Sequence, residues 1–455
     1  MFGRDQSRIL AWSDSGRVRL WNAPVPEAIG STMEHNGEVD GATFDRTERR
    51  ILTWSDDGTA RLWDTATQTA IGRPMEHSDW VVGARFDRDE RRILTWTGDG
   101  TVRLWNASTQ EAIGSPMEHG GWVEGATFDR DERRILTWSR DGTVRLWDLK
   151  KQAAIGSPME HNGEVHGATF DRAERRILTW GEDGAVKLWD ASMQAAIGSP
   201  MEHNGEVHGA TFDREERRIL TWSDDGRVRL WDATTQETIG SPMKHDGRVW
   251  GATFDRTERR ILTWSDDGKV RLWNATTHET IGSPMEHDDR VLGATFDRTE
   301  RRILTWSEYG TVRLWDATTQ ETIGPPMEHD RDVNGAIFDR DERRILTWSE
   351  DNRAWLWDTA TRQVIQTLQH YDDVLGATFD REQRRILTWS ADGTVRLRPC
   401  GSHWYWPQGS WVLRVEVETG TYLLPSGELD FIPVTEWKVK KGRYDAIGRA
   451  IHTSK

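Results

Sequence analysis

The chain has 455 residues, a formal net charge of −15, 27 tryptophans and a single cysteine, Cys400. The acidic balance argues against nucleic acid or an anionic membrane as the main partner. One cysteine excludes an intramolecular disulfide framework and fits a reducing compartment, so we expect a cytoplasmic protein. No charged-then-apolar segment opens the chain and no apolar run is long enough to span a bilayer, so we expect neither a signal peptide nor a membrane helix.

Most of the chain repeats one unit every 42 residues, and the copy from His35 to Trp63, with the link to His77, is the clearest. A fixed period of this length is informative because it determines the architecture before any local prediction does. The opening histidine recurs at His77, His119, His161, His203, His245, His287 and His329, and then at His370 after one residue has been lost.

The unit contains four short β-forming runs, which we term strands a to d. Residues 39–44 form an apolar segment, and residues 50–55 and 59–63 form two β-rich runs joined by the Asp-Gly turn at 56–58. Asp-Gly between such runs predicts a hairpin, and residues 69–72 make a shorter fourth run. Because a single sheet of this kind is apolar on both faces, neighbouring sheets must stack, which predicts a β-propeller.

The two ends of the repeat array are incomplete. Residues 1–4 align with residues 43–46, so the first unit lacks strand a, and the last unit (374–397) shows no strand d. Strands b and c therefore occur ten times. The alternatives are a wide ring of about ten blades, a nine-blade ring with a spare N-terminal hairpin, or a smaller complete ring with extra units.

Two domains follow: an all-β propeller at 1–398 and a short α/β tail at 399–455. In the tail, residues 411–417 and 422–424 are predicted strands, and we expect 411–417 to supply the missing strand d. Trp437, Tyr444, Ile447 and Ile451 recur at helical spacing in a basic segment, which predicts a short helix.

The repeat resembles the WD40 family, because its period lies in that family's range and strand c ends Leu62-Trp63-Asp64. The resemblance implies a buried structural network of a histidine before strand a, a threonine on strand b, an aspartate in the b–c turn and the strand-c tryptophan. The first three sets are His35, Thr53, Asp57, Trp63; His77, Thr95, Asp99, Trp105; and His119, Thr137, Asp141, Trp147.

Several positions depart from the family pattern. Tyr309 replaces the network aspartate in one unit, Arg398 stands where the last unit should have its tryptophan, and Ala11 and Ser15 replace the threonine and aspartate of the first unit. The tail also resembles the C-terminus of large bacterial WD-repeat signalling proteins. That second resemblance implies an alternative, in which the chain is the C-terminal sensor of a larger product with an upstream NTPase or protease-like domain.

We find no motif that requires catalysis, a cofactor or a metal. The phosphate-loop, zinc-helix and nucleophile-elbow spacings are absent. The HNGEVH sequence at 161–166 suggests a metal site only superficially, since His161 is the expected network histidine and His166 a surface residue of strand a. The FDR-x-ERR sequence at 44–50 is interpreted as a solvated, self-neutralising turn rather than a docking site.

The positions after each histidine and before each turn aspartate vary among otherwise near-identical units, and both lie at one end of the sheet. Drift after recent duplication is the alternative explanation, but large exposed aromatic residues favour a binding face. We therefore expect a non-catalytic scaffold that binds a protein or peptide there; an enzyme that uses a central channel is a third, disfavoured hypothesis. The candidate binding residues are Trp80, Trp122, Arg140, Arg248, Trp250 and Arg290.

Overall fold

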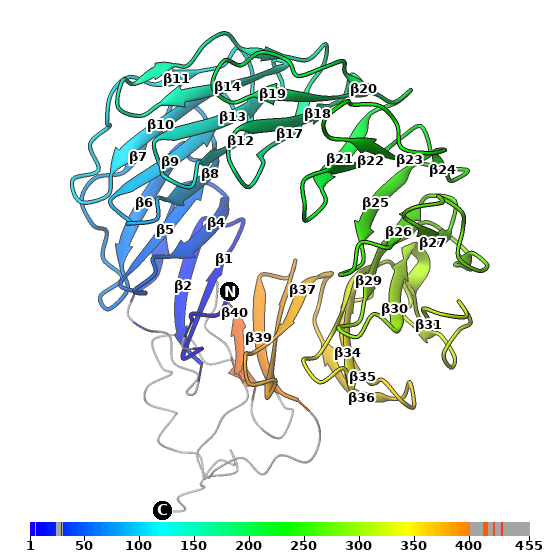
Figure 1. Ribbon diagram of the computed structural model, residues 1–455. Helices are drawn as coiled ribbons and strands as arrows, with labels where there is room; N and C mark the ends of the chain where they lie inside the picture. Colours follow the sequence, from blue (N-terminus) through cyan, green and yellow to red (C-terminus); the bar gives the residue numbers. More distant parts are fainter. Residues whose placement is uncertain are drawn as a thin grey trace, which may run out of the picture. The chain divides into compact units, whose positions relative to one another are not determined.

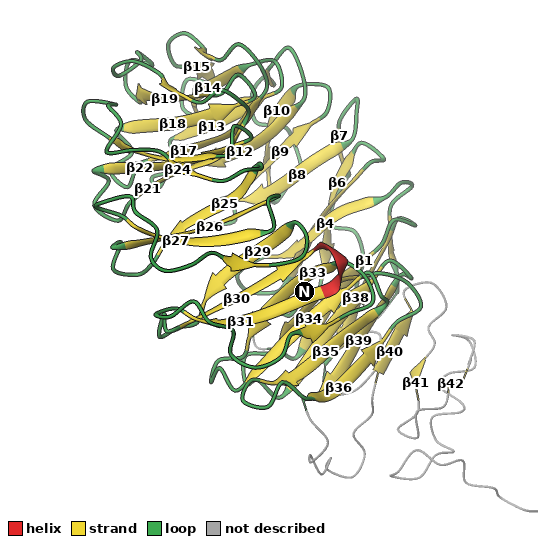
Figure 2. Cartoon of the chain, turned by 90° about the vertical axis from the view of Figure 1, so that its right-hand side faces the viewer, coloured by secondary structure: helices red, strands yellow, loops and turns green. Residues whose placement is uncertain are grey.

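The computed structural model describes residues 1–4, 6–23, 29, 31–400, 413–416, 422–423 and 429–430. Within them the chain is all-β, a β-propeller of ten successive antiparallel blade sheets, which we number 1 to 10 in chain order (Figure 1). Blade 1 has three strands and the later blades follow the order a-b-c-d. The single turn of 3₁₀ helix, η1 (Glu308–Gly310), is the red segment in Figure 2.

The strands recur with nearly constant bounds. Strand a is β4 (Val39–Phe44), β8 (Val81–Phe86), β12 (Val123–Phe128), β17 (Val165–Phe170), β21 (Val207–Phe212), β25 (Val249–Phe254), β29 (Val291–Phe296), β33 (Val333–Phe338) and β37 (Val374–Phe379). Strand b is β1 (Arg8–Trp12), β5 (Arg50–Ser55), β9 (Arg92–Thr97), β13 (Arg134–Ser139), β18 (Arg176–Gly181), β22 (Arg218–Ser223), β26 (Arg260–Ser265), β30 (Arg302–Ser307), β34 (Arg344–Ser349) and β38 (Arg385–Ser390).

The outer half of each blade is equally regular. Strand c is β2 (Arg17–Asn22), β6 (Thr59–Asp64), β10 (Thr101–Asn106), β14 (Thr143–Asp148), β19 (Ala185–Asp190), β23 (Arg227–Asp232), β27 (Lys269–Asn274), β31 (Thr311–Asp316), β35 (Arg353–Asp358) and β39 (Thr394–Pro399). Strand d is β3 (Met33–Glu34), β7 (Met75–Glu76), β11 (Met117–Glu118), β16 (Met159–Glu160), β20 (Met201–Glu202), β24 (Met243–Lys244), β28 (Met285–Glu286), β32 (Met327–Glu328), β36 (Val364–Gln369) and β40 (Leu413–Glu416), and blade 4 adds β15 (Ala153–Ala154).

The prediction of strand d at residues 69–72 is wrong in its bounds. Only an isolated bridge at Ala70 pairs with strand c, and the strand proper is β7, after Pro74. Pro74 has no N–H to donate to a ladder, and Gly72 has a φ of +71° that turns the chain out of the sheet. Blade 9 lacks this Gly-Pro segment, and there the six-residue strand β36 pairs with strand c at five positions.

The core lies between neighbouring blades rather than inside one of them. Leu136, Val144 and Met159 of blade 4 pack against Val165 and Ile177 of blade 5, and all five side chains are fully buried. The same arrangement recurs between blades 5 and 6, 6 and 7, and 7 and 8. Since burying a Val, Leu or Ile side chain stabilises the fold by about 1.5–3 kcal/mol, each of these blades depends on its neighbours for stability.

A glycine on strand a accommodates the strand-b tryptophan. Gly125 lies against the indole of Trp138, and a Cβ at residue 125 would come within 2.1 Å of that ring. Strand a has a bulge between Val123 and Gly125 at this point. The same glycine recurs in each complete strand a, because a side chain there would occupy the space of the ring.

The chain divides into two compact units, which we describe separately. Unit 1 comprises Met1–Asp57, Arg61–Ile71 and Met327–Lys455, and unit 2 comprises Gly58–Ala60 and Gly72–Pro326. In unit 1, Ile9 and Trp21 of blade 1 pack against Leu387 and Leu397 of blade 10. Blade 1 also packs against blade 2 through a second buried cluster, so the N-terminal hairpin is not a spare element.

The incomplete blades are completed by different means. In blade 1 an isolated bridge between Phe2 and Ile9 stands in the place of strand a. In blade 10, β40 pairs antiparallel with β39, so residues 413–416 supply the strand d that we expected from 411–417. The strands β41 (Tyr422–Leu423) and β42 (Leu429–Asp430) form a hairpin, and the predicted helix at 437–451 lies outside the described residues. In the described part, no helix has the length and apolar character needed to cross a membrane.

Candidate partner-binding surface

The structure brings together the first predicted network set. The Nε1–H group of Trp63 donates to Thr53 Oγ1 over 2.9 Å, and Thr53 Oγ1 lies 2.7 Å from His35 Nε2. On the other side of the imidazole, His35 Nδ1 lies 3.0 Å from Asp57 Oδ2. These contacts place the imidazole hydrogen on Nδ1, so a single chain of hydrogen bonds runs from the indole to the carboxylate. It ties strands b and c to the segment that precedes strand a.

In blade 3 the predicted set is joined only in part. Trp105 and His77 both contact Thr95 Oγ1 at 2.8 Å, but His77 Nδ1 is buried and has no hydrogen-bond partner. Asp99 instead accepts hydrogen bonds from Ser78 and from residues on either side of the turn. Although burial raises the pKa of Asp99, these hydrogen bonds outweigh the effect of burial and lower it to about 2.

Blade 4 places a hydroxyl group between the histidine and the aspartate. His119 Nε2 lies 2.7 Å from Thr137, which accepts from Trp147, and His119 Nδ1 lies 3.0 Å from Thr143 Oγ1. Asp141 Oδ2 is 3.3 Å from the same nitrogen. Burial lowers the pKa of His119, the Asp141 carboxylate offsets part of that decrease, and the resulting pKa is about 4.

Blade 8 shows how the network forms without its aspartate. Tyr309 has a φ of +58° in the turn, and His287 Nδ1 lies 2.8 Å from the hydroxyl of Thr311. Burial, with a smaller effect from the nearby charge of Arg313, lowers the pKa of His287 to about 3. A hydroxyl group is therefore sufficient to accept from the uncharged imidazole.

The FDR-x-ERR turns are solvated only in part, which corrects the interpretation from sequence, because their first aspartate and last arginine are held in contacts within and between blades. In blade 4, Asp129 is buried and accepts from Arg134 Nε over 2.8 Å. The guanidinium of Arg134 then reaches blade 5, where Nη2 donates to the carbonyl of Glu174 over 3.2 Å and Cζ lies 5.4 Å from the centre of the Phe170 ring. The Glu174 carboxylate accepts from the backbone N–H of Arg130. We call this set of contacts an inter-blade link.

The arginine-to-carbonyl hydrogen bond of the inter-blade link is found between eight pairs of consecutive blades in the described residues. The pairs of arginine and acceptor carbonyl are Arg8–Glu48, Arg92–Glu132, Arg134–Glu174, Arg176–Glu216, Arg218–Glu258, Arg260–Glu300, Arg344–Gln383 and Arg385–Gln6. The last pair joins blade 10 to blade 1 within unit 1. The invariance of this motif therefore follows from packing between repeats.

The variable positions do lie together at one end of each blade. The backbone N–H of Arg140 in the b–c turn donates to the carbonyl of Trp122 at the entry to strand a over 2.8 Å. The equivalent bond joins Asp266 to Arg248 over 3.0 Å. Turn and strand entry are thus adjacent in each blade, as the meander predicts.

Three of the six candidate binding residues form one cluster in blades 3 and 4. The rings of Trp80 and Trp122 meet edge to face with centroids 4.7 Å apart. The guanidinium of Arg140 lies over the ring of Trp122, with Cζ 4.5 Å from the ring centroid. Arg140 also forms ion pairs with Glu124 and Glu164. Trp122 is consequently half-buried, whereas Trp80 is 41% exposed. Gly98 provides the space, since a Cβ there would lie 2.9 Å from Trp80 Nε1.

The other three candidates form a second cluster in blades 6 to 8. Trp250 stacks on His208 with ring centroids 4.9 Å apart, and its Nε1 donates to Asp266. Arg290 lies 2.7 Å from Asp266 through Nε, and Arg248 pairs with Asp224 of blade 6 at 3.5 Å. Trp250 remains 36% exposed.

The two clusters are connected by residues that the sequence analysis did not select. His166 of blade 5 lies 3.5 Å from Glu206 of blade 6, and His208 lies within hydrogen-bonding distance of Asp224. Every consecutive pair of blades from 3 to 8 is therefore joined by side chains from this edge. We call this set the variable row: Trp80, Trp122, Arg140, Glu164, His166, Glu206, His208, Arg248, Trp250 and Arg290. Variation after each repeat histidine (the positions equivalent to Glu38 and Asp40) and before the turn aspartate was the sequence signal for all of them.

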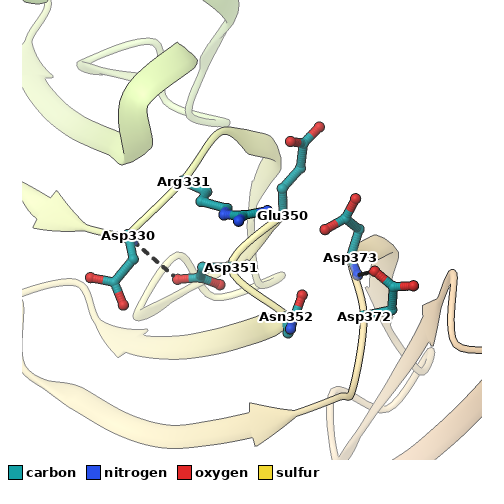
Figure 3. Close-up of a pocket in the computed structure, with 7 residues that line it drawn as sticks. All are labelled: Asp330, Arg331, Glu350, Asp351, Asn352, Asp372 and Asp373. Atoms are coloured by element: carbon teal, nitrogen blue, oxygen red, sulfur yellow. Dashed lines mark hydrogen bonds between the residues drawn. The ribbon is translucent and has the colours of Figure 1, made fainter.

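A separate hollow of about 270 Å³ lies between blades 9 and 10 in unit 1 (Figure 3). One of its walls is Asp351, which lies 2.9 Å from His329 Nδ1 and accepts from the backbone N–H of Asp330. The hollow therefore borders the aspartate of the blade 9 network, Asp351. Within the described residues, no group of three or more His, Cys, Asp or Glu side chains is placed to hold a metal ion. The hollow is lined by Asp330, Arg331, Glu350, Asp351, Asn352, Asp372 and Asp373.

A comparison with protein-family models agrees with this architecture. The family model described as WD domain, G-beta repeat, matches residues 27–64, 70–106, 111–148, 197–232 and 237–274. No curated protein matches the sequence. Among solved structures, the computationally designed Ika8 protein is 20% identical, over 70% of this chain and 96% of the designed chain, with a TM-score of 0.49.

Five repeats thus match the family model by sequence. The blades around them have the same strands, the same hydrogen-bonded His–Thr pair and the same inter-blade packing. The chain is a WD40-repeat β-propeller.

Proposed function

We propose that this protein is a non-catalytic interaction scaffold that binds a protein or peptide partner at the variable row. WD40 propellers are typically interaction scaffolds, and the coarse assignment follows from the family. The observation that supports this particular surface is the exposure of Trp80 and Trp250. They are large aromatic residues at positions that differ from blade to blade, while the rest of each blade is nearly invariant.

The composition of the row is that of a binding surface. Trp and Arg are the residues most enriched in interface hot spots. Each indole is held in a fixed orientation, Trp80 by the ring of Trp122 and Trp250 by the ring of His208. A side chain that is already ordered loses little conformational entropy when a partner binds, so it contributes more of its contact energy to affinity.

The charged groups of the row are arranged for structure rather than for proton transfer. Arg140 pairs with Glu124 and Glu164, and Arg290 pairs with Asp266 and Glu308. The hydrogen bond to Glu124 is the largest of the effects that raise the pKa of Arg140. Each of these arginines thus lies between two carboxylates, which fixes the positions of the charges along the row.

The test is selection from a random peptide-display library on the immobilised full-length chain. We expect enriched peptides that lose binding to the Trp80→Ala, Trp250→Ala double variant while its melting temperature stays unchanged, because both indoles are partly exposed. Met193→Ala is the matched control, since Met193 is a 69% exposed apolar side chain outside the row. Enriched peptides that bind the double variant as tightly as the original chain would refute the assignment of the site, as would the absence of any enriched peptide.

A further inference from the structure

The exposed apolar side chains of the variable row fall into two groups with a polar stretch between them. Trp80 provides the first anchor in blade 3. Trp250 of the row provides the second, together with Leu292 of blade 8, which lies outside the defined row at the position equivalent to Trp250; each of the two is 36% exposed. Blades 5 and 6 contribute His166 and His208 at the positions equivalent to Trp250. Neither blade places an exposed large hydrophobic residue on the row.

The stretch between the anchors is acidic. Its carboxylates are Glu164, Glu182, Glu206 and Asp224, and blades 5 and 6 place no Lys or Arg at the corresponding strand-entry and turn positions. Glu164 is paired with Arg140, and Asp224 with Arg248. The partners of Glu206 are histidines, at 3.5 and 4.0 Å, and Glu182 accepts only a backbone N–H in the described contacts. Two carboxylates of the middle stretch thus lack a permanently charged partner.

We propose that the partner is an extended basic peptide segment with one large apolar side chain on each side of its Lys or Arg residues. The segment would lie along the variable row, with its apolar side chains on Trp80 and on Trp250 with Leu292, and its basic residues against Glu182 and Glu206. This proposal rests on the proposed function and specifies its ligand.

Such a peptide would match the row both in its apolar contacts and in its charge. Apolar contact with a fixed indole provides affinity, whereas complementary charge fixes the register and excludes acidic competitors. An extended chain covers about 3.3–3.6 Å per residue, so one continuous segment reaches across several blades without a folded domain of its own. The net charge of −15 adds long-range attraction for a basic ligand.

The experiment uses synthetic peptides with a fluorescent label and the full-length chain. The first series has Trp at both ends of a Lys-containing linker, with the linker lengthened one residue at a time. The second replaces each Lys by Glu, and the third replaces one Trp by Ser. The protein variants are Trp80→Ala, Trp250→Ala and the charge reversal Glu182→Lys, Glu206→Lys, with Glu160→Lys on the exposed strand d of blade 4 as the matched control.

We expect one linker length of the Trp–Lys–Trp series to bind best, with roughly tenfold weaker binding for either Trp→Ala variant and for the one-Trp peptides. The charge reversal should weaken Lys peptides and strengthen Glu peptides, and Glu160→Lys should leave both unchanged. Equal binding of the Lys and Glu series, or sensitivity to only one of the two tryptophans, would overturn the two-anchor basic ligand. If either result is obtained, the peptide-library experiment decides whether the scaffold function also fails. Library peptides whose binding depends on Trp80 or Trp250 would support the scaffold function without the basic ligand, whereas the absence of such peptides would refute both proposals.

Discussion

Nη2 of Arg134 in blade 4 lies 3.2 Å from the carbonyl oxygen of Glu174 in blade 5. The same arginine is held at Nε by Asp129 of its own blade, so one side chain joins the turn of one repeat to the turn of the next. Because charge-assisted hydrogen bonds are stronger than neutral ones, this contact supplements the apolar core between the blades.

Removing the carboxylate that holds this arginine should destabilise the fold. We expect Asp129→Asn to lower the free energy of unfolding by about 1–3 kcal/mol, because the amide cannot accept from both the backbone N–H groups and the guanidinium that Asp129 now binds. Urea unfolding followed by tryptophan fluorescence measures the loss. Asp131→Asn is the control in the same turn, since Asp131 is exposed, and it should change stability by less than about 0.5 kcal/mol. Equal effects of the two variants would contradict the role of the inter-blade link.

Stability should decrease as the pH falls from about 7 to about 5. Burial lowers the pKa of His77, His119 and His370 to about 4, well below the ordinary value of 6.5. The unfolded chain therefore binds more protons than the folded chain between these values, so stability is complete above about 6.5 and is lost towards about 4. Each such histidine contributes a slope of up to about 1.4 kcal/mol per pH unit.

Urea titrations at a series of pH values test this slope. Asp99, whose pKa is lowered to about 2, titrates below this window and does not account for a change between pH 7 and pH 5. The titration uses an Asp40→Asn background, because burial raises the pKa of Asp40 to about 7 and this carboxyl group would contribute the opposite slope. A free energy of unfolding that stays constant over the window in that background would show that the network histidines are not held in the uncharged form.

Adding a methyl group to strand a should disrupt the packing of the strand-b tryptophan. We expect Gly125→Ala to cost about 1–3 kcal/mol, because the new Cβ would lie 2.1 Å from Trp138 Cζ2. Gly120→Ala is the matched control, because the nearest atom to its Cβ would lie at 3.6 Å, in ordinary contact. A melting temperature for Gly125→Ala equal to that of the control would contradict the model of steric exclusion. The Trp138→Leu change should recover part of the loss in a double-mutant cycle.

The sequence predicts the strands of each blade well because the information is local and repeated. The hairpin of strands b and c follows from the Asp-Gly turn, and Gly58 has the expected positive φ of +74°. Strand d was placed wrongly because its apolar run at 69–72 is followed by Pro74, and the loss of a ladder hydrogen bond outweighs β propensity there.

The candidate site was predictable in location but not in detail. Variation among near-identical repeats indicated the edge that contains Trp80 and Trp250. It did not indicate that Arg140 covers the ring of Trp122, because that position of Arg140 depends on a side-chain contact within blade 4 and on a salt bridge to Glu164 of blade 5. Asp99 does not bind His77, because it accepts hydrogen bonds from Ser78 and Thr97 instead. The repeat pattern shows which residue occupies a position but not which of several donors its side chain binds. The inter-blade links were missed because their partners lie about one repeat apart in the sequence. One sequence signal was available: Gln6 and Gln383 replace the glutamate found at this position in the other repeats. An uncharged Gln at a position that is otherwise Glu suggests that its backbone carbonyl, rather than its charge, makes the contact.

The inter-blade links have a direction, which gives the repeat array two different ends. In every link named above, the blade that provides the arginine donates to the blade that follows it, so this interface is heterologous, and copies of it can be added without limit. In unit 1 the arginine of blade 10 reaches Gln6 of blade 1, so the donor end and the acceptor end of the array satisfy each other within one molecule. A truncated chain without blade 10 would present Arg344 at one end and Gln6 at the other, and these complementary ends would favour head-to-tail polymers. We therefore expect the full chain to join head to tail less readily than such a truncated chain.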